Sequence, residues 1–317
     1  MKNIPSNILV LSLFISILAG CTANNLPFMR EETAQRLASA AWMVGRDIPS
    51  GALPLRAYER MHEHREPANI YIGGEGDIHG LGFNRAPENP VALHLATKDD
   101  ADNLAYIARP CQYIDVKDCT QKYWGGNEYS DDVINAYSLA LNDMVARYDI
   151  EGFNLIGYSG GAAIAALLAD KRSDILSIRS VAGILDTDTY SVIHEKAAFE
   201  GSVNPILAAA NIKDIPQFHF IGGKDTQVPP AVLHGYIQAT PPSNCIHSLM
   251  VQEATHNKGW VDKWPELLKL PLSCYMRSEQ IALPSGTEEL PIFKPDFGKA
   301  LKKKAKHKVS PEKPVKP

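Results

Sequence analysis

A serine stands among glycines in Gly157-Tyr158-Ser159-Gly160-Gly161, directly after an apolar run that begins at residue 153. An alanine-rich stretch, residues 162–169, follows it. The pattern predicts a buried strand that turns sharply into a helix. Glycine is favoured beside the serine because a Cβ would collide with neighbouring chain in so tight a turn. In this setting Gly-x-Ser-x-Gly makes Ser159 a candidate nucleophile.

A serine hydroxyl needs a base that takes its proton and a group that orients the base. Asp225 follows a predicted strand at residues 217–221 and a glycine turn, and a proline-opened helix comes after it. His256 follows a predicted strand at residues 246–251. The carboxyl ends of parallel strands meet at one edge of a sheet. We therefore expect Ser159, Asp225 and His256 to come together there.

Two alternatives remain open for the acid and the base. Asp225 could instead cap the helix that follows it, and Asp186 or Asp188, after another predicted strand, would then be the acid. Four further histidines lie on predicted strands or on the predicted surface: His194, His219, His234 and His247.

Apolar runs rich in β-branched residues alternate with helical patterns, which predicts a mostly parallel sheet with helices on both faces. The predicted strands are residues 69–72, 103–108, 153–157, 178–182, 217–221 and 246–251. The predicted helices are residues 31–43, 131–147, 161–169, 230–239 and 260–270. No internal repeat or Pro/Gly/Ser-rich linker interrupts this core, so we expect one domain.

Two long connections are expected to wall a substrate pocket, residues 76–90 and residues 185–215, because each follows a predicted strand. The second has a helical piece near residues 204–210 and is too short to form a lid domain. Four aromatic residues are interpreted as packing residues rather than substrate contacts: Tyr123, Trp124, Trp260 and Trp264.

From about Ile70 to Leu270 the chain resembles a bacterial α/β-hydrolase, specifically an exported lipoprotein-type member. The segments that carry the resemblance are residues 71–76 (Tyr-Ile-Gly-Gly-Glu-Gly), 108–113 (Ala-Arg-Pro-Cys-Gln-Tyr), 157–161, 222–225 with 228–230, and 255–256. The order Ser, Asp, His also matches that family. The resemblance implies the α/β-hydrolase fold with a short insertion rather than a lid domain. It also implies Ser159 as nucleophile, His256 as general base then acid, and Asp225 as the orienting carboxylate.

Acyl transfer needs donors aimed at the oxyanion of the tetrahedral intermediate. The amide of Gly160, directly after the nucleophile, is one expected donor. The resemblance places the second in Gly73-Gly74-Glu75-Gly76, at the amide of Glu75, with Gly76 as the alternative. The sequence departs here from the family's His-Gly-Gly-Gly pattern, because Glu75 brings an anionic side chain close to the expected hole.

The amino terminus has the pattern of an export signal, with Met1-Lys2-Asn3 followed by a short apolar stretch at residues 8–18. The ending Leu18-Ala19-Gly20-Cys21 resembles a bacterial lipobox. Residues 1–20 are then a lipoprotein signal peptide, and Cys21 is lipidated and anchors the chain to a membrane. Because Thr22 is not Asp, we expect the outer membrane, facing the periplasm. A plain cleaved secretory signal is the alternative.

Four cysteines remain once Cys21 is set aside, and an exported chain meets an oxidising compartment, so disulfides are expected. Three pairings are possible, and proximity in the sequence favours Cys111 with Cys119 and Cys245 with Cys274. Four buried free thiols are the alternative.

Residues 291–317 form a basic tail that follows an expected hydrolase domain at residues 21–290. From Lys294 onward, nine lysines face only Asp296 and Glu312. Such a composition cannot bury apolar area, so we expect a disordered tail. It is either a solvated extension or a weak electrostatic contact for anionic lipid or cell-wall polymer. No basic and aromatic platform accompanies it, so we expect no nucleic-acid partner.

No metal site and no cofactor are expected. His62-Glu63-His64 lacks a further cluster at ligand spacing, and residues 73–76 lack the spacing of a dinucleotide loop. The sequence therefore predicts a cofactor-free serine hydrolase that cleaves an ester or thioester, or an amide, of a small-molecule or lipid-like acyl substrate. The alternative is a non-catalytic lipoprotein of the same fold that binds an envelope component.

Overall fold

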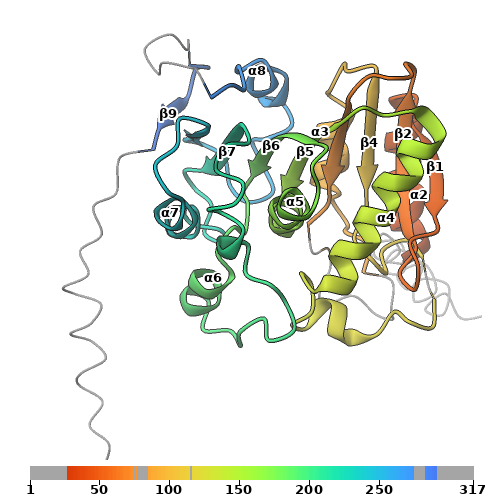
Figure 1. Cartoon of the computed structure of the whole chain (residues 1–317), viewed down its shortest axis with the longest axis horizontal. Helices are drawn as coiled ribbons and strands as arrows, with labels where there is room; N and C mark the ends of the chain where they lie inside the picture. The colour runs from red at the N-terminus through yellow and green to blue at the C-terminus, as the bar shows by residue number, and fades with distance from the viewer. Residues whose placement is uncertain (1–26, 75, 77–84, 115, 275–282, 291–317) are drawn as a thin grey trace, which may run out of the picture.

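The computed structural model describes residues 27–74, 76, 85–114, 116–274 and 283–290. The expected signal peptide, Cys21, Glu75 and the basic tail lie outside these residues. Within them the strands form one sheet in the order β1-β2-β4-β3-β5-β6-β7-β8-β9 (Figure 1). The strands are β1 (Val44–Ile48), β2 (Leu55–Met61), β3 (Ala68–Ile72), β4 (Asn103–Ile107), β5 (Phe153–Tyr158), β6 (Ile175–Val181), β7 (Gln217–Gly222), β8 (Ile246–Val251) and β9 (Thr287–Glu289).

The middle of the sheet is parallel, from β4 through β3, β5, β6 and β7 to β8, whereas β1, β2 and β9 pair antiparallel. The chain leaves β3 toward β4 on one side and then returns to build β5 on the other. The loops after β3 and β5 therefore diverge, and such a switch point is where open α/β sheets bind ligands. This arrangement confirms the predicted mostly parallel sheet.

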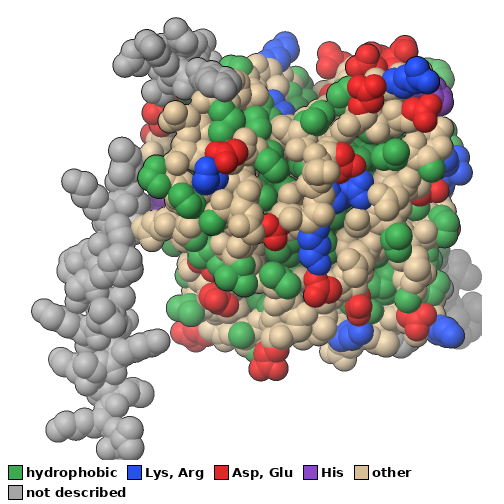
Figure 2. All heavy atoms as spheres, in the orientation of Figure 1, with side chains coloured by type: hydrophobic (Ala, Val, Ile, Leu, Met, Phe, Trp, Pro, Cys, Tyr) green, Lys and Arg blue, Asp and Glu red, His purple; other side chains and the backbone are tan. Residues whose placement is uncertain are grey.

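Helices cover both faces of the sheet (Figure 1). One core cluster joins the sheet to α4, α5 and α7, and a second joins the opposite face to α2, α3 and α8. The helices are α2 (Pro27–Ala40), α3 (Val91–Ala96), α4 (Asp131–Tyr148), α5 (Gly160–Lys171), α6 (Thr187–Ile193), α7 (Pro230–Ala239) and α8 (Trp264–Leu268), with 3₁₀ turns η2 (Gln121–Trp124) and η3 (Pro205–Leu207). On the face shown in Figure 2, acidic and basic side chains are interspersed.

Several elements differ from the sequence prediction. The hairpin β1–β2 was missed because charged residues interrupt its apolar pattern. One of these, Glu59, is buried in the structure, where Arg147 of α4 pairs with it at 2.7 Å. The helix expected at residues 260–270 is only α8, and β6 begins at Ile175 rather than at residue 178. The insertion at residues 185–215 holds α6 and η3 and no separate lid domain.

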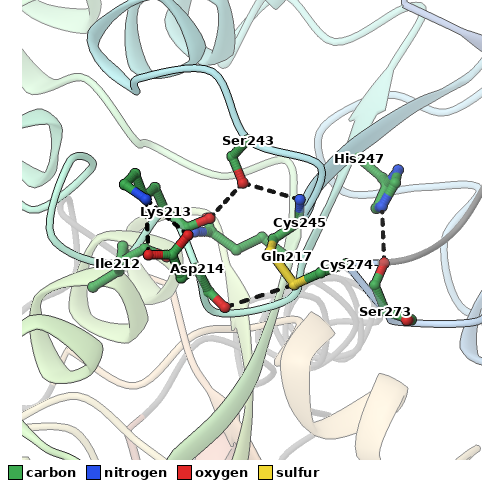
Figure 3. The surroundings of a disulfide bond; sticks show 9 residues. All are labelled: Ile212, Lys213, Asp214, Gln217, Ser243, Cys245, His247, Ser273 and Cys274. Carbon is green, nitrogen blue, oxygen red and sulfur yellow. Dashed lines mark hydrogen bonds and ion pairs between the residues drawn. A yellow bond between two sulfur atoms is a disulfide. The ribbon is translucent and has the colours of Figure 1, made fainter.

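Both disulfides have the pairing that the sequence favours. Cys111–Cys119 closes a short loop after β4, on the same side as the loops that follow β3 and β5. Cys245–Cys274 lies just before β8, at the other end of the sheet. Its neighbours there are Ser243, which accepts from the Cys245 amide at 3.0 Å, and Asp214 (Figure 3). One disulfide is therefore close to the switch point, and the other is remote from it.

A membrane-spanning helix is not found among the residues that the structure describes.

A polar network is buried under α7. His219 of β7 pairs through Nδ1 with the Ser180 hydroxyl at 2.8 Å and through Nε2 with Gln217 Oε1 at 3.2 Å. Gln217 Oε1 also accepts from the Tyr236 hydroxyl at 2.9 Å. Burial, with a smaller contribution from the charge of His247, lowers the pKa of His219 to about 3. The imidazole is therefore neutral in the folded protein at neutral pH.

We expect His219 to make the protein acid-sensitive. Between its ordinary pKa of 6.5 and about 3, only the unfolded chain binds the proton, so stability falls as the pH falls. The slope from this group approaches about 1.4 kcal/mol per pH unit. Urea unfolding of His219→Gln at several pH values between 4 and 7 should show that its free energy of unfolding falls less steeply with falling pH than that of the wild type. Parallel curves for the two proteins would contradict this account.

Candidate active site

Ser159 lies at the turn between β5 and α5, with φ 52° and ψ −122°. The turn is tight because the helix passes close to the sheet. A Cβ on Gly161 would lie 2.2 Å from the Ile72 carbonyl oxygen, and one on Gly157 would lie 2.4 Å from Cα of Ala162. Only glycine permits this approach. The Ser159 amide donates to the Val181 carbonyl at 3.0 Å, which fixes the nucleophile against the next strand.

His256 comes from the loop after β8, and its ring meets the serine. Its Nε2 lies 3.1 Å from Ser159 Oγ. Two aromatic side chains hold its backbone, because the Tyr158 hydroxyl and the Trp260 indole N–H both donate to the His256 carbonyl, at 3.0 and 2.9 Å. The Tyr158 ring also lies against the imidazole, with centroids 5.3 Å apart. The residue before the nucleophile thus helps to position the base.

Asp225, in the loop after β7, contacts the other side of the imidazole. Its Oδ2 lies 2.9 Å from His256 Nδ1. Its Oδ1 accepts from the amides of Gln227 and Val228, at 2.8 and 2.9 Å. The carboxylate therefore orders the turn before α7 and faces the histidine at the same time. The two sequence interpretations of Asp225, cap and orienting acid, describe different oxygens of one side chain.

The alternative acids and bases lie elsewhere. Asp186 caps α6, where its Oδ1 accepts from the amides of Asp188 and Thr189 at 3.1 and 3.2 Å. His219 belongs to the buried network under α7. The other three histidines contact groups away from the serine or lie on α7: His194 at the Gln227 carbonyl, His247 at the Ser273 carbonyl, and His234.

The three side chains form a hydrogen-bonded line in which His256 can take the proton of Ser159 while Asp225 orients the ring. If Nδ1 donates to the carboxylate, Nε2 is left as the acceptor that faces the serine hydroxyl. Ser159, Asp225 and His256 expose only 3%, 5% and 8% of their surface. Charge that develops here is poorly screened by water, so the fixed donors around it act strongly.

Of the two expected oxyanion donors, only one is among the described residues. Gly160 begins α5, and the first N–H groups of a helix have no acceptor within the helix. The helix dipole adds partial positive charge at this end. Glu75 lies outside the described residues, but its neighbour Gly74 packs against the nucleophile. A Cβ on Gly74 would lie 3.2 Å from the Ser159 Cβ.

A cavity of about 820 Å³ opens in front of Ser159 and His256. The insertion supplies one wall, with Tyr190 and Phe199, and the segment after β4 supplies another, with Trp124 and Glu128. Trp124 packs against the main core cluster, as the sequence interpretation expects, and it also lines the cavity, which the sequence did not indicate. No local sequence pattern indicates that Trp124 lines the cavity, because its position depends on how the loop after Cys119 folds.

His62 and His64 are exposed. No group of three His, Cys, Asp or Glu side chains with the arrangement of a metal site occurs in the described ranges.

No protein-family model matches this chain, and no curated protein sequence does. Solved structures do match. The Pyrococcus furiosus esterase Pf2001 aligns over 73% of this chain and 92% of its own, with a TM-score of 0.52 and 14% identity. Est1E from Butyrivibrio proteoclasticus, solved with ferulic acid bound, aligns over 70% and 97%, with a TM-score of 0.52 and 11% identity.

A third match is the Pyrococcus horikoshii acylaminoacyl peptidase, with a TM-score of 0.51, 10% identity, and coverage of 74% of this chain and 42% of that one. At such identities the likeness concerns the fold. Together with the strand order, the glycine-flanked turn and the helices on both faces, it shows that this chain has the α/β-hydrolase fold.

Proposed function

We propose that the protein is a serine hydrolase that cleaves an ester or thioester through an acyl-enzyme on Ser159. The observation that carries the proposal is the continuous line from Asp225 Oδ2 to His256 Nδ1 and from His256 Nε2 to Ser159 Oγ, at 2.9 and 3.1 Å. A buried network of this kind without chemistry would leave the strained serine turn and the adjoining cavity unexplained.

In the first half-reaction, Ser159 Oγ attacks the carbonyl carbon of the substrate while its proton passes to His256 Nε2. The carbonyl oxygen becomes an oxyanion, which the Gly160 amide is positioned to stabilise. The imidazolium, stabilised by the Asp225 carboxylate, then gives its proton to the departing alcohol or thiol. In the second half-reaction water repeats these steps and releases the acid and the free serine.

The cavity favours a small-molecule or lipid-like acyl substrate. Its volume of about 820 Å³ suits a ligand of drug-like size. Its walls combine aromatic residues with the charged groups Glu128 and Lys196. The matched structures named esterases support ester cleavage, and the one named acylaminoacyl peptidase keeps amide cleavage as an alternative.

We further propose that the enzyme acts in the bacterial envelope, held by lipid on Cys21 and facing the periplasm. The lipobox-like Leu18-Ala19-Gly20-Cys21 supports this location, as do two disulfides, which persist in oxidising compartments. The second candidate function, non-catalytic binding of an envelope component, is favoured only by the acidic Glu75 at the position of an expected oxyanion donor.

Ser159→Ala should remain folded and lose turnover of p-nitrophenyl esters by at least about 10⁴-fold, since it removes the nucleophile. Wild-type protein should react rapidly with a fluorophosphonate, which only an activated serine does. The variant should not react. Mass spectrometry should find the adduct on Ser159. A wild type that neither turns over esters nor labels would favour the binding function.

Asp225→Asn tests the orienting carboxylate separately. The amide can still accept from the Gln227 and Val228 amides through Oδ1, so the loop should stay ordered. It cannot stabilise an imidazolium, and its NH₂ group favours the wrong tautomer. We expect kcat to fall by about 10³–10⁴-fold. The matched control is Asp186→Asn at the α6 cap, which should change kcat little. A similar loss in both variants would argue against the assigned role.

A further inference from the structure

A short turn after β4, residues 109–113, contacts both sides of the loop that follows β3. The Gln112 side chain donates from Nε2 to the Gly74 carbonyl at 3.4 Å. The amide of Arg85, where the β3 loop returns, donates to the Cys111 carbonyl at 3.3 Å. The turn therefore contacts the loop after β3 both where it begins, at Gly74, and where it ends, at Arg85.

Gly76 shows how closely these parts fit. Its φ is +80°, and a Cβ on it would lie 2.1 Å from the Arg85 carbonyl oxygen and 2.5 Å from Gln112 Nε2. The space that a side chain at position 76 would need is thus taken by the returning chain and the Gln112 side chain. Gln112 thus contacts the chain at Gly76 and at Gly74, and a Cβ on Gly74 would lie 3.2 Å from the Ser159 Cβ.

Hydrogen bonds within the turn also restrain it. Gln112 is 1% exposed, and its Oε1 accepts from the Arg109 amide at 3.1 Å. The Gln112 amide in turn donates to the Arg109 carbonyl at 3.1 Å. Both of its neighbours have left-handed backbone, with φ 66° at Cys111 and 65° at Tyr113. Non-glycine residues adopt this conformation only when their surroundings impose it, and here the Cys111–Cys119 disulfide is one such restraint.

We propose that this turn is a clamp that sets the positions of Gly74 and Gly76 near the nucleophile, with Gln112 as its positioning residue and the Cys111–Cys119 disulfide as its lock. The proposal rests on the proposed hydrolase function and adds to it the residue and the cross-link that keep the oxyanion side of the site in place. Gln112 is not among the described residues that line the cavity. It acts through the backbone of Gly74 and Gly76.

Gln112→Leu keeps the volume of the side chain and removes its hydrogen bonds to the Arg109 amide and the Gly74 carbonyl. With p-nitrophenyl acetate we expect kcat to fall about 10–100-fold while KM changes less than about threefold, because misplacement of one donor by about 1 Å costs rate rather than binding. Affinity for phenylboronic acid, which forms a tetrahedral adduct on the serine, should fall by the same factor as kcat/KM. Thermal unfolding identifies temperatures at which the variant is folded.

The second disulfide supplies a matched control. Cys111→Ser with Cys119→Ser removes the lock and should lower kcat about tenfold with KM nearly unchanged. Cys245→Ser with Cys274→Ser removes a cross-link at the far end of the sheet (Figure 3). It should leave kcat within about twofold when assayed below its own unfolding temperature.

The outcomes separate the two proposals. A wild type that hydrolyses esters together with a Gln112→Leu variant of equal kcat overturns the clamp and leaves the hydrolase function intact. Equal losses in the two disulfide variants also overturn it, because the effect would then be general destabilisation. A wild type that neither hydrolyses esters nor reacts with fluorophosphonate overturns the hydrolase function, and the clamp falls with it.

Discussion

The close approach of α5 to the end of β3 is the constraint on which the site depends. Gly161 lies so near the Ile72 carbonyl that no side chain fits between them. This contact forces the chain to turn within one residue, and that residue, Ser159, takes a backbone conformation that non-glycine residues rarely adopt. Packing in the core compensates for this strained conformation, because α5 is buried over most of its length. The serine hydroxyl is consequently presented at the switch point of the sheet.

The base and the acid reach the serine because their own loops pack closely. A Cβ on Gly222 would lie 2.6 Å from the Ala254 carbonyl oxygen, so the loops after β7 and β8 run against each other. Asp225 and His256 are carried by these two loops. The contact that fixes their spacing is again made by glycine backbone. Three strands thus deliver three side chains, and in each case tight backbone packing beside a glycine accompanies the side-chain hydrogen bonds.

The parts of the fold that could be predicted from the sequence are those with local signals. The apolar runs of β3 to β8, the glycines around Ser159 and the proline at the start of α7 each mark a local structure. The hairpin β1–β2 has no such signal, because the buried Glu59 pairs not only with Arg46 of β1 but also with Arg147, 88 residues away. For α6 a signal existed, since Asp186 stands directly before the helix as its cap. The cavity wall at Trp124 depends on long-range folding of a loop, which no local pattern encodes.

The pairing of the cysteines does not by itself show what each disulfide restrains. Proximity in the sequence favoured both equally, and both are present. Their surroundings differ, however. Cys245–Cys274 joins the entry of β8 to the segment after α8, where a cross-link restrains the fold as a whole. Cys111–Cys119 restrains a turn with left-handed residues on both sides of Gln112. Such backbone persists only where the surrounding structure imposes it. The turn contacts the backbone at Gly74 and Arg85, and Gly74 lies against Ser159, so this cross-link is connected to the site of the proposed chemistry.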